Sequence, residues 1–379
     1  MTSDSLNLIK LQVGRERARA LSIVAVMAVL IATLWPMNPF PRNRVSWLPK
    51  NGVRFQKRGL IVSDKPLDLP MDTDSKSYTL ELLLRPSNIE SLSTILAFYN
   101  PTASKQLLVR QLKSGVGITQ DSDSERGRII NCHISHVFVP GRLLFIGISS
   151  GANGITFYVD GKRSYSFPGS TISRGDLSGY IVLGTSPVTD QSWNGEMRGL
   201  ALYSKALTDE EAFQHYQAWL YPDDHHPDLD DALYRYTFSE GTGRTINNQV
   251  ISEPNLEIPT TYAVLHKAFL RSPQEEFRPD WRYVLDVLSN IAGFIPLGLM
   301  LCTYLDWTKA PWKAVLLTVF FCGIFSCMIE IAQFFIPGRG SGTTDIITNT
   351  FGGALGAALS QISAMRRLSQ RMKLARTEA

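Results

Sequence analysis

Four long apolar runs constrain the fold of this chain more than any other feature of its sequence. They occupy residues 20–35, 287–305, 314–336 and 346–365, and one carboxylate, Glu330, interrupts them. A helix that crosses the hydrocarbon core of a bilayer needs about 20 predominantly apolar residues. The sequence therefore predicts four membrane-spanning helices, with a large polar segment between the first and the second.

The first run is the shortest, and it has two interpretations. The basic residues before it are Lys10, Arg15, Arg17 and Arg19. A secretory signal has such a basic start, but it ends in a small-x-small cleavage site, whereas this chain continues as "PMNPFPRN". We therefore expect residues 20–36 to be an uncleaved transmembrane helix.

Positive charge lies beside alternate ends of the runs. The arm 1–19, the loop 306–313 and the tail 366–379 are all basic. Lys and Arg next to spans mark the cytoplasmic side of a membrane. The sequence thus predicts a multi-pass protein of the inner or plasma membrane, with both termini cytoplasmic and the large polar segment outside. The net charge of +4 follows from this pattern, so no nucleic-acid partner is expected.

Cysteine and histidine usage indicates neither a disulfide framework nor a metal site. Of the four cysteines only Cys132 lies outside the apolar runs, and we expect a small buried side chain there. The six histidines show no metal-ligand spacing. Asp121 and Asp123 leave two alternatives, calcium ligation or a solvated loop. We expect no cofactor and no resident metal, with calcium left open.

Residues 47–221 read as short strands separated by turns. The clearest strands are "SYTLELLLRP", "STILAFYN", "RLLFIGISS" and "GYIVLGTS". Many short strands rich in β-branched and aromatic residues predict a β-sandwich or jelly roll. In "NGITFYVDGKRSYSF" Asp160 and Gly161 supply the turn of a hairpin.

A short helix is predicted to close this domain. In "TDEEAFQHYQAWL" Thr208 and Glu211 form a capping box, and the apolar residues share one helical face. The next segment, 222–283, has two interpretations. It is either an extra strand region of the sandwich or a linker that sets its distance from the bilayer.

Polar residues of the last three runs recur in pairs. The pairs are Asp286 with Asn290, Glu330 with Gln333, and Asp345 with Asn349. Separations of three or four positions place both members of a pair on one helical face. On the predicted topology all six lie at one depth, near the outer surface, and Arg339 can fold over them.

Ionisable groups at this depth are costly, and two interpretations follow. In the first, Arg339 neutralises Glu330 or Asp345, and the amide side chains tie the helices together. In the second, the cluster is a pocket that receives an envelope substrate. The candidate catalytic residues are then Glu330, Arg339 and Asp345. The candidate binding residues are Asp286, Asn290, Gln333 and Asn349.

The outer domain resembles a known family. "FYVDGK", "YIVLG" and "WNGEMRGLALYSKALTDEE" occur in the order and spacing of the second half of a laminin G-like, or concanavalin A-like, jelly roll. The resemblance implies a binding module for glycans or proteins. The shared residues are those of the fold, since Asp160 and Gly161 make a turn while Trp193 and Gly195 pack a strand.

The membrane runs resemble a second family. "WPMNPF", "DVLSNIAGFIPLG" and "IEIAQFFIPGRGSGTTDIITNTFGGALG" are similar to the VanZ family, named for a teicoplanin-resistance protein. The resemblance implies a membrane domain over 284–365. It makes six residues counterparts of the family's recurring polar positions: Asn290, Glu330, Gln333, Arg339, Asp345 and Asn349. In this chain the large outer domain stands where the family usually has a short loop. This departure from the family pattern argues against a simple antibiotic-resistance role.

These observations predict a mixed fold, in which a four-helix transmembrane bundle carries an all-β extracytoplasmic jelly-roll sandwich. The favoured function is recognition or handling of a glycan or lipid-linked component of the bacterial cell envelope. The alternatives are a protein-interaction scaffold of an envelope export or sorting system, and an intramembrane hydrolase or transferase. The expected partners are the lipid bilayer and one such glycan, lipid-linked substrate or envelope protein.

Overall fold

The computed structural model divides the chain into two compact units. It describes residues 3–69, 77–102, 105–122, 130–221, 231–306 and 310–377. The first unit, Met1–Pro39 with Ala268–Ala379, is helical, and the second, Phe40–Lys267, is built mainly of strands. The helical unit is thus assembled from both ends of the chain, and the strand unit is inserted between them.

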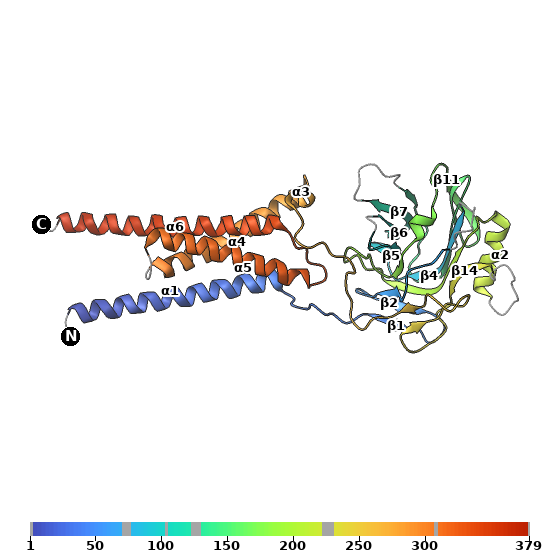
Figure 1. Ribbon diagram of the computed structural model, residues 1–379, viewed down its shortest axis with the longest axis horizontal. Helices are drawn as coiled ribbons and strands as arrows, with labels where there is room; N and C mark the ends of the chain where they lie inside the picture. Colours follow the sequence, from blue (N-terminus) through green and yellow to red (C-terminus); the bar gives the residue numbers. More distant parts are fainter. Residues whose placement is uncertain are drawn as a thin grey trace. The chain divides into compact units, whose positions relative to one another are not determined.

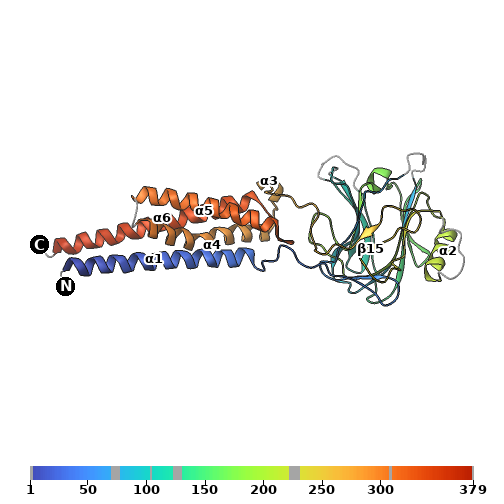
Figure 2. The same ribbon diagram turned by 60° about the horizontal axis from the view of Figure 1, so that its bottom comes forward.

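Four long helices form a bundle in the first unit (Figures 1 and 2). They are α1 (Ser3–Leu34), α4 (Trp281–Asp306), α5 (Pro311–Phe334) and α6 (Thr343–Thr377), with the single turn α3 (Pro273–Glu276) before α4. Within the described residues, three helical stretches are long and apolar enough to cross a membrane: Glu16–Leu34, Trp281–Asp306 and Pro311–Phe334. They coincide with the first three predicted spans.

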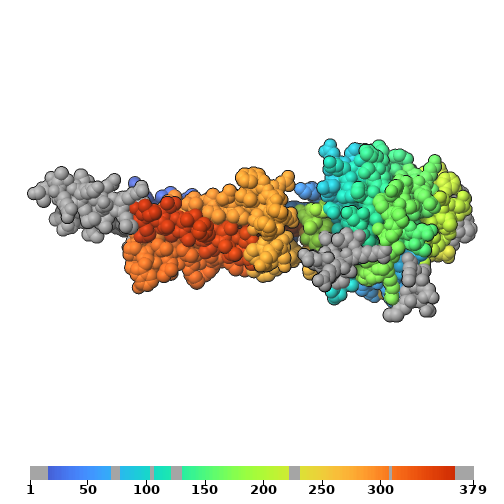
Figure 3. Space-filling view, turned by 90° about the horizontal axis from the view of Figure 1, so that it is seen from above, coloured from blue at the N-terminus to red at the C-terminus, as the bar shows by residue number. Residues whose placement is uncertain are grey.

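The fourth predicted span lies in α6, which is a helix but is not among those three. Figure 3 shows α6, in red, lying along its orange neighbours in the bundle. A Cβ atom added at Gly352 would meet the carbonyl oxygen of Ile291 at 2.3 Å, and one at Gly356 would meet that of Ile295 at 2.1 Å. Small residues thus let α6 approach α4 closely. They also make α6 less apolar, so its membrane crossing stays a prediction.

Two eight-stranded antiparallel sheets form the second unit. The first sheet has the order β1 (Val45–Trp47), β2 (Val53–Phe55), β13 (Gly195–Tyr203), β4 (Tyr78–Pro86), β9 (Leu144–Gly151), β10 (Gly154–Val159) and β11 (Lys162–Phe167), and β14 (Ala232–Tyr236) also pairs with β13. The second has the order β15 (Thr245–Ile246), β16 (Leu256–Glu257), β3 (Ile61–Ser63), β12 (Tyr180–Leu183), β5 (Leu92–Tyr99), β6 (Lys105–Leu112), β7 (Gly115–Ser122) and β8 (Asn131–Ile134). A 3-10 helix, η1 (Arg174–Leu177), precedes β12. The predicted fold class, a jelly-roll-like sandwich with a helical bundle, is confirmed.

The two sheets enclose one apolar core. Alternate residues of β4, including Leu80 and Leu82, belong to the same buried cluster as Val109 and Ile118 of the second sheet. Alternation places such residues on one face of a strand. Cys132 is 1% exposed in this cluster, which confirms its expected role as a small buried side chain.

The helix α2 (Asp209–Leu220) packs against the first sheet, and its predicted capping box is present. Thr208 Oγ1 accepts from the backbone N–H of Glu211, whose carboxylate accepts from the N–H of Thr208. The carboxylate of Glu81 on β4 is fully buried beneath α2, where it contacts Nδ1 of His215 and accepts from Nε1 of Trp219. A buried carboxyl group with two hydrogen-bond partners anchors this helix to the sheet.

The predicted hairpin between β10 and β11 is also confirmed. Asp160 and Gly161 have φ values of 49° and 74°, as a two-residue turn with left-handed backbone requires. Oδ1 of Asp160 accepts from the backbone N–H of Phe145, which holds the turn against β9. Asp123 and the side chain of Asp121, the candidate calcium ligands, lie outside the described residues.

The chain enters and leaves the second unit side by side. Arg42 and Thr261 form an antiparallel bridge, flanked by a bond from Asn43 N–H to the Thr260 carbonyl. The Asn43 side chain also donates to the carbonyl of Pro259. Between residues 231 and 267 the chain extends both sheets, through β14 in the first and β15 and β16 in the second.

Candidate functional site

Asp345, at the start of α6, joins the polar residues of α4 to an open pocket. Nδ2 of Asn290 donates to Oδ1 of Asp345 over 2.8 Å. Asp286, one turn before Asn290, lines the same pocket as Asp345. The structure thus brings Asp286, Asn290 and Asp345 together near the N-terminal ends of α4 and α6.

Glu330, near the C-terminal end of α5, is 1% exposed and contacts the start of α6 from inside the bundle. Its Oε2 accepts from the backbone N–H of Gly342 over 2.8 Å. Oε2 of Glu276, at the end of α3, accepts from the N–H of Thr344 over 3.1 Å. The first amides of a helix lack intrahelical partners and carry partial positive charge. Both carboxylates therefore stabilise the start of α6.

The other two predicted amides bond to different helices. Nε2 of Gln333 on α5 donates to the carbonyl of Thr33 on α1 over 3.0 Å. Nδ2 of Asn349 on α6 donates to Oγ of Ser326 on α5 over 2.9 Å. Asp345 and Asn349 are one turn apart, yet they contact α4 and α5 respectively. Such bonds hold helices together where apolar contacts alone give little preference over lipid.

Arg339 does not fold over the cluster. Its Nη2 donates to the carbonyl of Trp35, just after α1, over 2.9 Å. No ion pair among the described residues joins it to Glu330 or Asp345. The Gly342 amide and the Asn290 side chain instead satisfy those two carboxylates. The ion pair of Arg339 with one of these carboxylates, which the first interpretation supposed, is therefore not found among the described residues.

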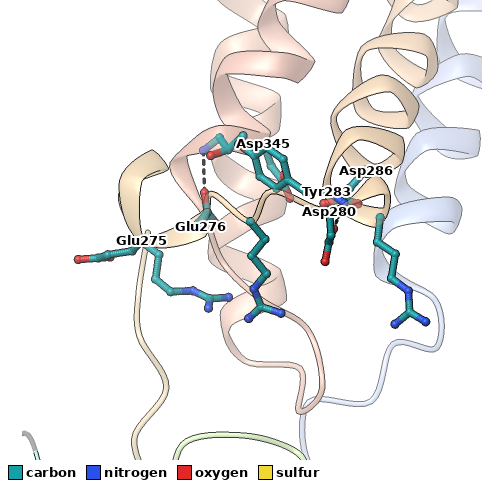
Figure 4. A pocket seen from close by; sticks show the side chains of 10 residues that line it. Glu275, Glu276, Asp280, Tyr283, Asp286 and Asp345 are labelled. Carbon is teal, nitrogen blue, oxygen red and sulfur yellow. Dashed lines mark hydrogen bonds between the residues drawn. The ribbon is translucent and has the colours of Figure 1, made fainter. Parts of the chain in front are cut away.

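An open, strongly charged pocket of about 440 Å³ lies where α3, α4 and α6 begin or end. Its lining residues are Arg271, Glu275, Glu276, Arg278, Asp280, Arg282, Tyr283, Asp286, Thr344 and Asp345. Figure 4 shows Glu276 on the side of α3 and Asp345 on α6, with Asp280, Tyr283 and Asp286 at the start of α4 across from them. Carboxylates outnumber guanidinium groups, five to three.

Backbone bonds between the segment before α3 and the loop before α6 position the pocket. The N–H of Arg271 donates to the carbonyl of Ser341, and the carbonyl of Arg271 accepts from both the N–H and the hydroxyl of Thr343. Ser272 then caps α3 with a capping box to Glu275. These bonds attach the charged segment to the start of α6, so the backbone around the pocket is held in place by hydrogen bonds.

Besides Thr344, seven pocket residues were not singled out by the sequence analysis. They are Arg271, Glu275, Glu276, Arg278, Asp280, Arg282 and Tyr283. All fall in "RSPQEEFRPDWRY", which was included in the linker 222–283. The available signal was a dense mixture of both charges directly before an apolar run.

The pocket can bind a group that carries both signs of charge. Guanidinium groups bind phosphate or carboxylate oxygens through paired N–H donors. The carboxylates accept hydrogen bonds from ammonium or hydroxyl groups. Of the predicted residues, Asp286 and Asp345 reach this pocket, whereas Glu330, Gln333, Arg339 and Asn349 do not line it.

Two protein-family models match the chain. Residues 233–364 match VanZ/LLP1, and residues 63–212 match the concanavalin A-like lectin/glucanases superfamily. The chain carries a VanZ-like domain. This VanZ-like domain contains the whole candidate site, and the match begins in β14, well before α4. Both resemblances expected from the sequence are confirmed. The VanZ match and the three apolar helices make the chain a membrane protein.

Solved structures similar to the chain cover about half of it. A heptameric SAP-like pentraxin from Limulus polyphemus is 14% identical, with 47% of this chain and 79% of that chain covered and a TM-score of 0.31. The receptor binding domain of botulinum neurotoxin D is 15% identical, with 46% of each chain covered and a TM-score of 0.36. A Bacteroides ovatus protein described as carbohydrate-binding is 12% identical, with 57% and 62% covered and a TM-score of 0.38. The chain spans less than half of the botulinum neurotoxin chain. Likenesses at these TM-scores carry no argument about function, and no curated protein sequence matches.

Proposed function

We propose that this VanZ-like protein holds a lipid-linked component of the bacterial cell envelope by its headgroup, in the pocket between α3, α4 and α6, and that its jelly roll binds an envelope glycan. On this proposal the chain crosses the inner or plasma membrane four times. Both termini are cytoplasmic, and the pocket and the jelly roll face outward. The basic arm, loop and tail support this orientation.

The observation that carries the proposal is a charged pocket at the ends of apolar helices. Leu285 and Leu288 on α4, and Ile347 and Phe351 on α6, are large apolar side chains exposed on the bundle beside it. A membrane lipid has the same division into a charged head and an apolar tail. A lipid-linked molecule therefore matches the pocket and the neighbouring helix surface together, better than a small soluble ligand does.

Two of the pocket arginines are further evidence that the pocket binds a charged headgroup. Arg278 lies just before α4 and Arg282 lies in its first turn, at the end that the proposed orientation places outside. Lys and Arg beside a span favour the cytoplasmic side, so both residues oppose this orientation. Neither is in an ion pair within the described part of the chain. Binding of the anionic part of a headgroup that carries both signs of charge accounts for their presence.

A second candidate function is a protein-interaction scaffold. It is favoured by the bonds of Glu330, Gln333 and Asn349, each of which lies inside the bundle and joins two of its segments. An intramembrane hydrolase or transferase would instead use pocket carboxylates as its acid and base, and Asp286 and Asp345 are the two of the predicted residues that line the pocket.

The proposal is tested by the lipids that remain bound to the purified protein. We expect native mass spectrometry of the full-length protein, extracted from its host membrane in mild detergent, to show a lipid-linked species. The double variant Arg278→Gln with Arg282→Gln should lower its occupancy at least about tenfold. A hydrogen bond to a charged group contributes about 1.5–3 kcal/mol, and 1.4 kcal/mol corresponds to a factor of ten.

The matched control is Lys162→Gln with Arg244→Gln, which removes the same charge from exposed positions outside this pocket. It should keep the bound species. Equal occupancy in the wild type and in the folded pocket variant would contradict the proposal and favour the scaffold.

A further inference from the structure

A second charged pocket, of about 580 Å³, lies on the jelly roll and is separate from the membrane domain. Its lining residues are Arg44, Arg54, Gln56, Lys57, Arg85, Pro86, Ser87, Gly141, Asn194 and Glu196. Four cations face one carboxylate there. The pocket therefore has the opposite charge balance to the one beside α4.

Strand register builds the centre of this pocket. Glu196 on β13 pairs with Arg54 on β2 at one side and with Arg85 on β4 at the other. Neighbouring strands are about 4.7–4.9 Å apart, so the three side chains form a row across one face of the sheet. Arg54 alternates with the buried residues Val53 and Phe55, so this row lies on the outer face.

The carboxylate of Glu196 holds the guanidinium groups in place. Oε1 accepts from Arg54 over 2.7 Å, and Oε2 accepts from Arg85 over 3.2 Å, while Arg198 lies 3.5 Å from the same carboxylate. The Glu196 side chain is 10% exposed, whereas that of Arg54 is 51% exposed. Each guanidinium has five N–H donors, so fixed donors remain for an incoming oxyanion.

The rim of the pocket adds positive charge that no described residue neutralises. Arg44 and Lys57 are exposed, and neither is in an ion pair within the described ranges. The side chains of Gln56 and Asn194 supply neutral donors and acceptors beside them. Fixed guanidinium groups, free cations and amides are the groups that bind an acidic sugar.

From this pocket we infer that the jelly roll recognises an anionic glycan, whose carboxylate, phosphate or sulfate groups bind Arg54, Arg85, Arg44 and Lys57. The inference rests on the proposed function in one respect, that the jelly roll binds a carbohydrate. A membrane surface fits less well. Proteins that lie on a membrane insert large apolar side chains into it, and the only apolar side chain among the ten lining residues is that of Pro86. Single-stranded nucleic acid fits less well too, because the ten lining residues include no aromatic ring for base stacking.

The inference is tested with polymers that share one backbone. Full-length protein in phosphatidylcholine nanodiscs is titrated with neutral dextran, carboxymethyl dextran, dextran phosphate and dextran sulfate, and binding is measured by interferometry. We expect binding of at least one charged dextran, weakening as salt rises, and none of neutral dextran. The charged arm that binds most tightly identifies the anion.

Arg44→Gln with Lys57→Gln should weaken this binding at least about tenfold, because two charge-assisted contacts are lost. Neither residue is in an ion pair, so folding should be unaffected. The control Lys162→Gln with Arg244→Gln removes equal charge from exposed positions outside the pocket, and should change the Kd less than about twofold.

Three results would overturn the inference. An equal loss in the pocket and control variants would show general attraction to a basic protein. Absence of binding to every charged dextran would exclude the site, and binding only to phosphatidylglycerol vesicles would assign it to lipid. In each case, binding of neutral glycans on an array would leave the proposed glycan binding by the jelly roll standing. If no glycan bound at all, both that proposal and the inferred anionic-glycan site would be refuted.

Discussion

Glu196 shows how one partly buried carboxylate organises a charged surface. Burial is the largest single influence and acts to raise its pKa, but the hydrogen bond from Arg54 and the charges of Arg85, Arg54 and Arg198 together outweigh it and lower the pKa. Its pKa in the folded protein is therefore below the ordinary value of 4.5. The folded protein binds this proton less readily than the unfolded chain does, so the ion pairs stabilise the fold.

Glu196→Gln should consequently destabilise the jelly roll at neutral pH and much less in acid. The stabilisation by Glu196 is fully present above a pH of about 4.5, and it is lost as the pH falls through the lower folded pKa. Thermal unfolding of the full-length wild type and variant is followed by β-sheet circular dichroism between pH 7 and pH 3. The difference between their unfolding temperatures should shrink as the pH falls. Glu210→Gln, at an exposed position on α2, is the control. A difference in unfolding temperature that does not change with pH would refute the stabilising role of the Glu196 ion pairs.

At the scale of elements, the crossing of α4 and α6 depends on glycine. Gly356→Ala should lower the unfolding temperature of the bundle, because the added Cβ would lie 2.1 Å from a backbone oxygen of α4. Overpacking of this kind costs about 1–3 kcal/mol. Gly293→Ala is the matched control, since nothing lies within 4 Å of its Cβ and alanine favours the helix by about 0.5–1 kcal/mol. Thermal unfolding in detergent measures both, and a stable Gly356→Ala variant would refute close packing.

Elements could be predicted from local sequence, but their neighbours could not. The capping box of Thr208, the hairpin turn at Asp160 and the first three apolar runs each depend on a few adjacent residues, and the structure confirms them. The spacing of Asp345 and Asn349 predicts that both lie on one face of a helix. It does not predict that this face lies between α4 and α5, so that Asp345 bonds to one helix and Asn349 to the other. Arg271 and Arg278 precede α4, where no helical period marks a residue, and Arg282 is only its second residue. Long-range packing decides such contacts.

At the scale of the whole molecule, the jelly roll should fold without the bundle. A fragment of residues 40–267 contains all strands of both sheets, whereas residues 47–221 lack β14, β15 and β16 and two of the three residues of β1. The shorter fragment leaves the edges of β13 and β3 open, and open edges promote association. We expect it to unfold at least about 5 °C lower and to aggregate. Circular dichroism and size-exclusion chromatography measure both properties, and equal behaviour of the fragments would contradict this division of the chain.

The paired entry and exit of the jelly roll have an evolutionary consequence. Because Arg42 and Thr261 are bridged, the two points at which a gene rearrangement would cut the module out are neighbours in space. The helices α1 and α4 contact each other within the bundle, so a short loop could rejoin them. Recombination could therefore remove this module, or replace it by another whose ends also meet, without rearranging the membrane helices. Lineages that share this bundle are free to diversify what they display on it.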